Sequence, residues 1–161
     1  MKVKRFEDII AWQKGHELTI FAFKCLINNK DFTFRNQFFG ALYSITNNIA
    51  EGFERGTTQE LLTFLYIARG SAGEVRSMLC LLEGMDQLTR PEFSNLKSEI
   101  SDLKSQAESI SRQLRAWAES LQNTSIKGQR YLDDKTRRRE QAARDREEFL
   151  KELADSRRTG R

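Results

Sequence analysis

The apolar residues between positions 93 and 121 repeat with a helical period, and this pattern constrains the fold more than any other feature of the chain. The repeating positions are Phe93, Leu96, Ile100, Leu103, Ala107, Ile110, Leu114, Trp117 and Leu121. Their alternating steps of three and four residues place them on one face of an α-helix, while polar and charged residues fill the other face. A helix with one apolar side requires partner helices that cover it.

Three earlier segments show the same period. In residues 61–82 the apolar positions are Leu61, Leu65, Ala68, Ala72, Val75, Leu79 and Leu82. In residues 38–53 they are Phe38, Leu42, Ile45, Ile49 and Phe53. In residues 6–27 they are Phe6, Ile10, Leu18, Phe21 and Cys25. The first of these helices in the chain has a second apolar strip, formed by Ile20, Phe23 and Ile27. We expect it to have a neighbour on each side, one of them from another subunit.

The segments between these helices are short. Residues 28–32 contain Asp31, which, like Thr33, is a candidate helix cap, and residues 85–93 contain the cap signature of Thr89, Pro91 and Glu92. Short links make consecutive helices antiparallel neighbours. The sequence therefore predicts an all-α, up-down-up-down four-helix bundle over residues 1–121, followed by a charged tail over residues 122–161.

The stretch NNIAEGFERGTTQE, residues 47–60, connects the second helix to the third. Thr57 and Glu60 form a capping-box pattern ahead of the third stripe, and Gly56 stands where a left-handed residue ends the preceding helix. A phosphate-binding loop is excluded because no strand precedes the stretch and no Gly-Lys-Ser/Thr follows it. The stretch is interpreted as a joint between helices.

Two residues before this joint need another explanation. Gly52 lies inside the helix, where glycine costs about 1 kcal/mol relative to alanine, so we expect another helix to approach closely there, with Gly70 or Gly73 opposite. Glu51 stands near the apolar stripe and is expected to have a fixed partner.

Composition limits the environment of the protein. The two cysteines, Cys25 and Cys80, are far apart and, with no signal peptide at the start, indicate free thiols on apolar helix faces in a reducing cytoplasm. No apolar run approaches the roughly 20 residues that a membrane span needs.

The residues do not assemble a catalytic set. A di-metal carboxylate centre in a bundle needs two Glu-x-x-His motifs, but the chain has a single histidine, His16, which we assign to surface or helix packing. Glu51 and Glu74 lack a nucleophile or a glycine-rich cradle beside them, so a structural role bonded to the neighbouring helix or to Asn48 is favoured. We expect no enzyme activity, cofactor or metal.

The segment SITNNIAEGFERGTTQELLTFLYIARGSAGEV, residues 44–75, resembles the four-helix-bundle family encoded by intervening sequences in bacterial large-subunit ribosomal RNA genes. The accessory variability determinant of diversity-generating retroelements belongs to the same superfamily. The matching positions are Ser44, Ile45, Asn48, Ile49, Ala50, Glu51, Gly52, Gly70, Ser71 and Glu74. The start, FEDIIAWQKGHEL, is similar to the family's opening pattern with Trp12 in register. The resemblance covers residues 6 to about 120.

The resemblance implies a non-enzymatic homopentameric ring that, in the retroelement branch, binds a reverse transcriptase and its RNA through basic surface. Two departures stand out. Phe39 and Gly40 replace an arginine pair that the family often carries, and Thr46 replaces a proline. Loss of the arginines weakens the case for nucleic acid on the bundle itself, where Arg55 and Arg69 remain as candidates.

Net charge is concentrated in the tail. Residues 1–121 carry 15 Lys and Arg against 15 Asp and Glu, whereas residues 122–161 carry 12 against 8. Acid-first pairs four residues apart, including Glu147–Lys151, predict a helix over about residues 133–156. We favour a solvated helix for the tail as a whole and phosphate contacts for its basic cluster. The candidate RNA-binding residues of the tail are Arg130, Lys135, Arg137, Arg138 and Arg139.

Two functional hypotheses follow. The first is an oligomeric accessory protein that binds RNA, a reverse transcriptase, or both. The second is a structural homo-oligomer that docks a protein partner without contacting nucleic acid.

Overall fold

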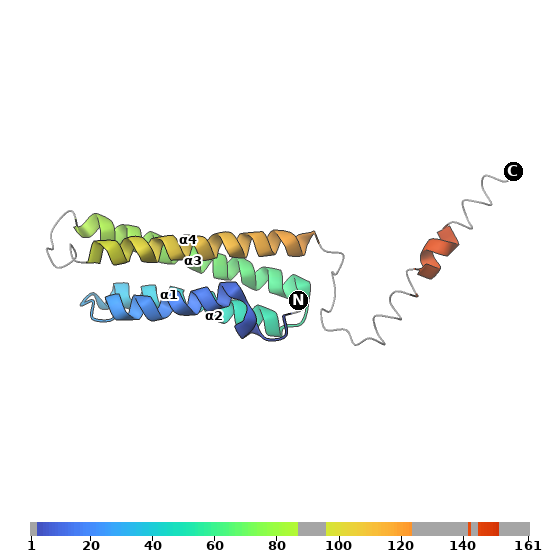
Figure 1. Cartoon of the computed structure of the whole chain (residues 1–161), viewed down its shortest axis with the longest axis horizontal. Coiled ribbons are helices and arrows are strands. Elements are labelled where there is room, and N and C mark those ends of the chain that lie inside the picture. Colours follow the sequence, from blue (N-terminus) through green and yellow to red (C-terminus); the bar gives the residue numbers. More distant parts are fainter. Residues whose placement is uncertain (1–2, 87–95, 124–141, 143–144, 152–161) are drawn as a thin grey trace. The chain divides into compact units, whose positions relative to one another are not determined.

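The computed structural model describes residues 3–86, 96–123, 142 and 145–151 (Figure 1). Within these ranges every element is a helix: the 3-10 helix η1 (Phe6–Asp8), α1 (Ile10–Leu26), α2 (Phe32–Glu54), α3 (Thr58–Asp86) and α4 (Lys97–Gln122). The all-α prediction is confirmed. None of the described helices is both long enough and apolar enough to cross a membrane.

The chain divides into two compact units, residues 1–128 and 129–161. The first unit holds the helices named above, and in the second residues 145–151 are helical. In the first unit α2 packs against α3, α3 against α4, and α1 against both α2 and α4 (Figure 1). This arrangement of four neighbouring helices confirms the predicted up-down-up-down bundle.

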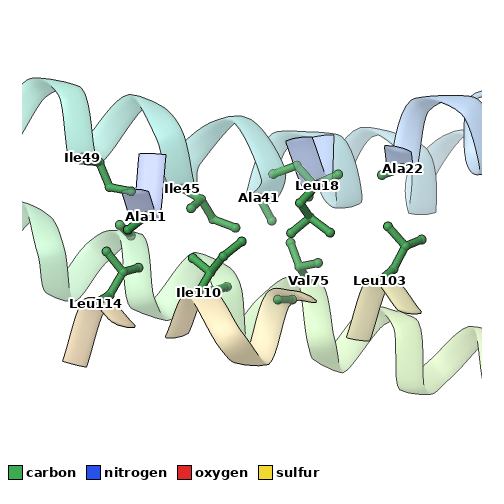
Figure 2. Packing of buried hydrophobic residues seen from close by; sticks show 14 of the residues in the cluster. Ala11, Leu18, Ala22, Ala41, Ile45, Ile49, Val75, Leu103, Ile110 and Leu114 are labelled. Carbon is green, nitrogen blue, oxygen red and sulfur yellow. The ribbon is translucent and has the colours of Figure 1, made fainter. Parts of the chain in front are cut away.

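The core runs along the bundle axis, where all four helices contribute side chains (Figure 2). Leu18 of α1, Ile45 of α2 and Val75 of α3 are each fully buried, and Leu103 and Ile110 of α4 meet them from the fourth side. The predicted stripes of residues 38–53 and 61–82 are buried throughout. In the stripe of α4, the buried residues are Ile100, Leu103, Ala107, Ile110 and Leu114. Leu96, Trp117 and Leu121 pack at the edge of the core, and Phe93 lies outside the described residues.

The predicted stripe of the first helix is confirmed only in part: Leu18 is fully buried, Phe6, Phe21 and Cys25 pack against the edge of the core, and the prediction for Ile10 is wrong. The buried positions of α1 are instead Ala11, Gly15, Leu18, Ala22 and Leu26. Ile10 is 63% exposed, and Phe21 and Cys25 are only half-buried. Phe6 belongs to η1, because the extended backbone at Ile9 separates the 3-10 turn from α1. Small residues face the core because the helices lie close: a Cβ on Gly15 would stand 3.0 Å from Cγ2 of Thr46.

The helix starts follow the predicted capping chemistry, with one difference. The Asp31 carboxylate accepts from the Phe34 N–H at 2.9 Å, which fixes the start of α2. Thr57 Oγ1 accepts from the Glu60 N–H at 3.2 Å, but the Glu60 carboxylate binds the Thr57 hydroxyl at 2.6 Å instead of a backbone N–H. Gly56 has φ 83°, as expected for the residue that ends α2. The predicted cap at Thr89, Pro91 and Glu92 lies outside the described residues.

Candidate functional site

A chain of hydrogen bonds connects α2 to α3 through three small polar side chains. Asn48 Nδ2 donates to the Ser44 carbonyl at 2.7 Å and to Ser44 Oγ at 2.9 Å. The hydroxyls of Ser44 and Ser71 lie 2.7 Å apart, and Ser71 Oγ donates to the Ile67 carbonyl at 3.1 Å. Each hydroxyl has one proton, so Ser44 donates to Ser71 when Ser71 donates to the Ile67 carbonyl. These residues therefore join α2 to α3 at a fixed register.

Gly52 lies at a close approach between α2 and α3. A Cβ at this position would stand 2.6 Å from Phe64 Cβ and 3.2 Å from Leu61 Cδ1. The expected close approach is present, but the opposing residues are Phe64 and Leu61. Gly70 and Gly73 have nothing within 4 Å of an added Cβ, so the prediction that one of them lies opposite Gly52 is wrong.

The two motif carboxylates do not act as a pair. Glu51 Oε1 accepts from Arg55 Nη2 at 2.6 Å, within α2, and both side chains are about half exposed. The expected bond from Glu51 to the neighbouring helix or to Asn48 is therefore wrong. Glu74 is exposed and makes no hydrogen bond or ion pair in the described part of the chain. The expected bond from Glu74 to the neighbouring helix or to Asn48 is therefore also wrong.

The basic candidates fall into two groups. On the bundle, the Arg55 guanidinium stands 5.4 Å from the centre of the Phe64 ring, and Arg69 is half-buried on α3. Arg130, Lys135 and the three arginines at 137–139 lie outside the described residues, so their role stays a prediction. In the described part of the tail, Lys151 Nζ lies 3.8 Å from Glu147 Oε1, which is the predicted i,i+4 pair.

A groove of about 500 Å³ lies between α3 and α4, and the sequence pattern did not predict it. Its lining includes Arg76, Ser77 and Cys80 of α3 and Lys104 and Ser105 of α4. Cys80 is exposed, so its assignment as a core thiol is wrong, whereas Cys25 is half-buried. The signal in the sequence was the spacing of small residues: Gly73 and Ser77 stand four apart on one helix, and Ser101 and Ser105 four apart on the next.

The second apolar strip of α1 is half open to solvent. Ile20 is 45% exposed and Ile27 is 38% exposed, while Phe23 packs against Phe39 of α2 with ring centres 4.3 Å apart. Tyr43 of α2 extends this surface; its ring lies 6.1 Å from that of Phe23. His16, also on α1, is exposed and stacks on Trp12 at 5.2 Å.

Among the described residues, no group of three or more His, Cys, Asp or Glu side chains is arranged to hold a metal ion. The candidate functional features of the bundle are the hydrogen-bond chain between α2 and α3, the half-exposed apolar strip of α1 and the groove between α3 and α4.

Comparison with known families identifies the architecture. The sequence model of the 23S rRNA-intervening sequence protein family matches residues 7–109, which is more than half of the chain. The chain belongs to this family. No curated protein compared with the chain matches it. The match includes α1, α2, α3 and the first half of α4, and therefore contains the register-setting Ser44, Asn48 and Ser71. It ends before the tail, and the resemblance to the retroelement determinant remains an expectation.

Proposed function

We propose that this member of the intervening-sequence family is a non-enzymatic, cytoplasmic, homo-oligomeric accessory protein that binds RNA, with a reverse transcriptase as a candidate protein partner. Family membership over residues 7–109 is the observation that carries the proposal. The roles of the motif residues support it, because Ser44, Asn48 and Ser71 hold two helices in register. A scaffold needs this kind of rigid surface and no reactive group.

The half-open strip on α1 supports self-association. Ile20 and Ile27 expose apolar side chains on the face of α1 that carries Phe23, and the exposed Tyr43 of α2 lies beside Phe23. Contiguous apolar surface on a globular protein marks interaction sites. In a ring of identical subunits, each subunit would cover this strip of its neighbour. The family resemblance implies a ring of five subunits.

The charge distribution supports RNA as the ligand. The tail supplies the entire net charge of +4, in a segment with four basic residues among the five positions 135–139. Lysine and arginine bound to phosphates release counterions, and this release drives sequence-independent nucleic-acid binding.

The test is analytical ultracentrifugation of the full chain with and without a fluorescent structured RNA. The proposal predicts an oligomer in the protein signal and RNA fluorescence that sediments with it. An oligomer that leaves all RNA behind would support the rival hypothesis, a structural oligomer that docks a protein partner. A monomer at micromolar concentration would contradict the oligomeric scaffold itself.

A further inference from the structure

Small residues make up half of the lining of the groove between α3 and α4. They are Gly73 and Ser77 on α3 and Ser101 and Ser105 on α4. Because a Cβ on Gly73 would meet nothing within 4 Å, the groove is open at that point. The volume of about 500 Å³ is in the range of small-molecule sites.

Three hydroxyl groups in this groove have no protein partner. In the described part of the chain, Ser77, Ser101 and Ser105 make no hydrogen bond, whereas Ser71, one turn and a half earlier on α3, donates to the carbonyl of Ile67. All three serines are exposed. Each hydroxyl is therefore free to donate to a ligand oxygen.

Arg76, which lines the groove on α3, makes only a long contact with Glu108. Its Nη2 lies 3.8 Å from Glu108 Oε2, which is beyond hydrogen-bond distance, and its side chain is 43% exposed. Glu108 is already held by Arg112, whose Nη1 donates to Oε1 at 2.9 Å. The donors of the Arg76 guanidinium are thus available to an incoming anion.

Lys104 lines the groove on α4. Its Nζ donates to Glu83 Oε2, and this hydrogen bond is the main cause that raises the pKa of Lys104 above its ordinary value. The ammonium therefore remains charged at neutral pH. Of the charged residues that line the groove, Arg76 and Lys104 are cations and Glu108 is an anion, which leaves the lining with one net positive charge.

We propose that this groove seats a phosphodiester segment of an RNA strand, with Arg76 and Lys104 contacting phosphate oxygens and the free serine hydroxyls donating to phosphate or ribose oxygens. Side chains of these types make most of the backbone contacts in nucleic-acid complexes. This inference rests on the proposed RNA-binding function and adds a bundle site to the tail. It adds Arg76 and Lys104 to Arg55 and Arg69 as candidate contacts on the bundle.

Cys80 provides a reporter inside the groove. It lines the groove and is exposed, so a neutral alkylating reagent such as iodoacetamide reaches it. Cys25 is the internal control: it is half-buried, lies on α1, and its pKa is raised mainly by burial, which keeps its thiolate fraction low. Mass spectrometry separates the two sites because they fall in different peptides.

The experiment measures alkylation of both cysteines in the full chain with a ten-nucleotide oligo(U), poly-glutamate or no addition. The inference predicts that oligo(U) slows Cys80 alkylation at least several-fold, leaves Cys25 unchanged, and that poly-glutamate does not protect Cys80. Equal protection by poly-glutamate would show simple charge attraction and overturn the phosphate assignment. Unchanged Cys80 alkylation with saturating, bound oligo(U) would also overturn it, while leaving the proposed RNA binding intact.

Two kinds of variant test whether RNA binds in the groove. Arg76→Gln with Lys104→Gln removes the cations, and binding of oligo(U) should weaken roughly 25-fold at 0.1 M salt if each contact releases about 0.7 counterion. Ser77→Leu with Ser105→Leu fills the groove without changing its charge and should also weaken binding. The control is Lys14→Gln, which removes an exposed charge from α1 and should change affinity little.

Circular dichroism of each variant checks that the helices persist. If a folded Arg76/Lys104 variant binds as tightly as the parent, the groove is not an RNA contact. If the parent binds no RNA of any kind, the proposed function fails as well, so the two failures are distinguishable.

Discussion

Two adjacent threonines at the start of α3 have opposite energetic roles. Thr57 Oγ1 accepts from the Glu60 N–H and its hydroxyl contacts the Glu60 carboxylate, so it stabilises the helix start. Thr58 is 4% exposed, and its hydroxyl oxygen is buried with no hydrogen-bond partner among the described residues. A buried polar group without a partner destabilises the folded state.

Thr58→Val should therefore raise the free energy of unfolding by about 1 kcal/mol, because it removes the unpaired hydroxyl and keeps the shape. The matched change Thr57→Val should lower it by about 1 kcal/mol through loss of the cap. Urea unfolding followed by circular dichroism measures both. If Thr58→Val proves destabilising, its hydroxyl has a favourable partner and this account of the site is wrong.

Two helical glycines, Gly52 and Gly70, should also respond to substitution with opposite changes in stability. Gly52→Ala should destabilise the protein by about 1–3 kcal/mol, because the new Cβ would stand 2.6 Å from Phe64 Cβ, an atom fixed to the backbone. Gly70→Ala should stabilise it by about 1 kcal/mol, because the position is helical and open. Thermal unfolding of the two variants compares them directly, and the same sign for both would refute the close approach.

At this scale the sequence predicted the conformational role of each joint residue but not its partners. The glycine at 56 and the threonine at 57 have the local geometry expected from their patterns. Gly52 was expected to face another glycine and instead faces Phe64. Local chemistry depends on nearby residues in the chain, whereas the facing residue depends on how two helices slide along one another.

At the scale of elements, large apolar residues identified α2, α3 and α4 correctly because their core faces are lined by Leu, Ile and Phe. They misplaced the core face of α1, where Ala11, Gly15 and Ala22 are buried and Ile10 is exposed. Small residues let helices approach closely but give a weak signal in a hydrophobicity pattern. The groove between α3 and α4 was missed for the same reason, because half of its lining is glycine and serine.

The outer strip of α1 should mediate self-association. Ile20→Lys should lower the molar mass measured by light scattering, because it places a charge in a surface that must lose water in the oligomer. The control is Glu17→Lys, an exposed change on the same helix that adds more positive charge. It should leave the mass unchanged. An Ile20→Lys variant with the parent's mass would show that this strip is not the subunit contact.

At the scale of the whole molecule, the bundle and the tail have different charge. Residues 1–121 are neutral in sum, and the tail beyond them carries the net positive charge. Residues 145–151 form a helix in which Phe149 and Leu150 are exposed, so the tail's helical character is confirmed in this part. The basic cluster at 135–139 lies outside the described residues. We propose that the bundle provides a rigid structure and the subunit contacts, and that the tail provides most of the electrostatic attraction to RNA.

This division predicts a specific effect of removing the basic cluster. Changing Lys135, Arg137, Arg138 and Arg139 together to Ala should weaken RNA binding and leave the bundle folded, because these residues lie outside all four apolar stripes. If each contacts one phosphate, the slope of log K against log salt should flatten by up to about 3 for single-stranded RNA.

The measurement that tests the central claim most directly is a salt titration of the affinity of the full chain for a structured RNA, with the four-alanine variant titrated in parallel. The account predicts that the parent binds RNA, that its affinity falls steeply as salt rises, and that the variant binds more weakly with a flatter slope while its circular dichroism is unchanged. Parent and variant with the same affinity and slope would show that the tail is only a solvated helix. A parent that binds no RNA even at low salt would contradict the claim that this protein is an RNA-binding accessory protein.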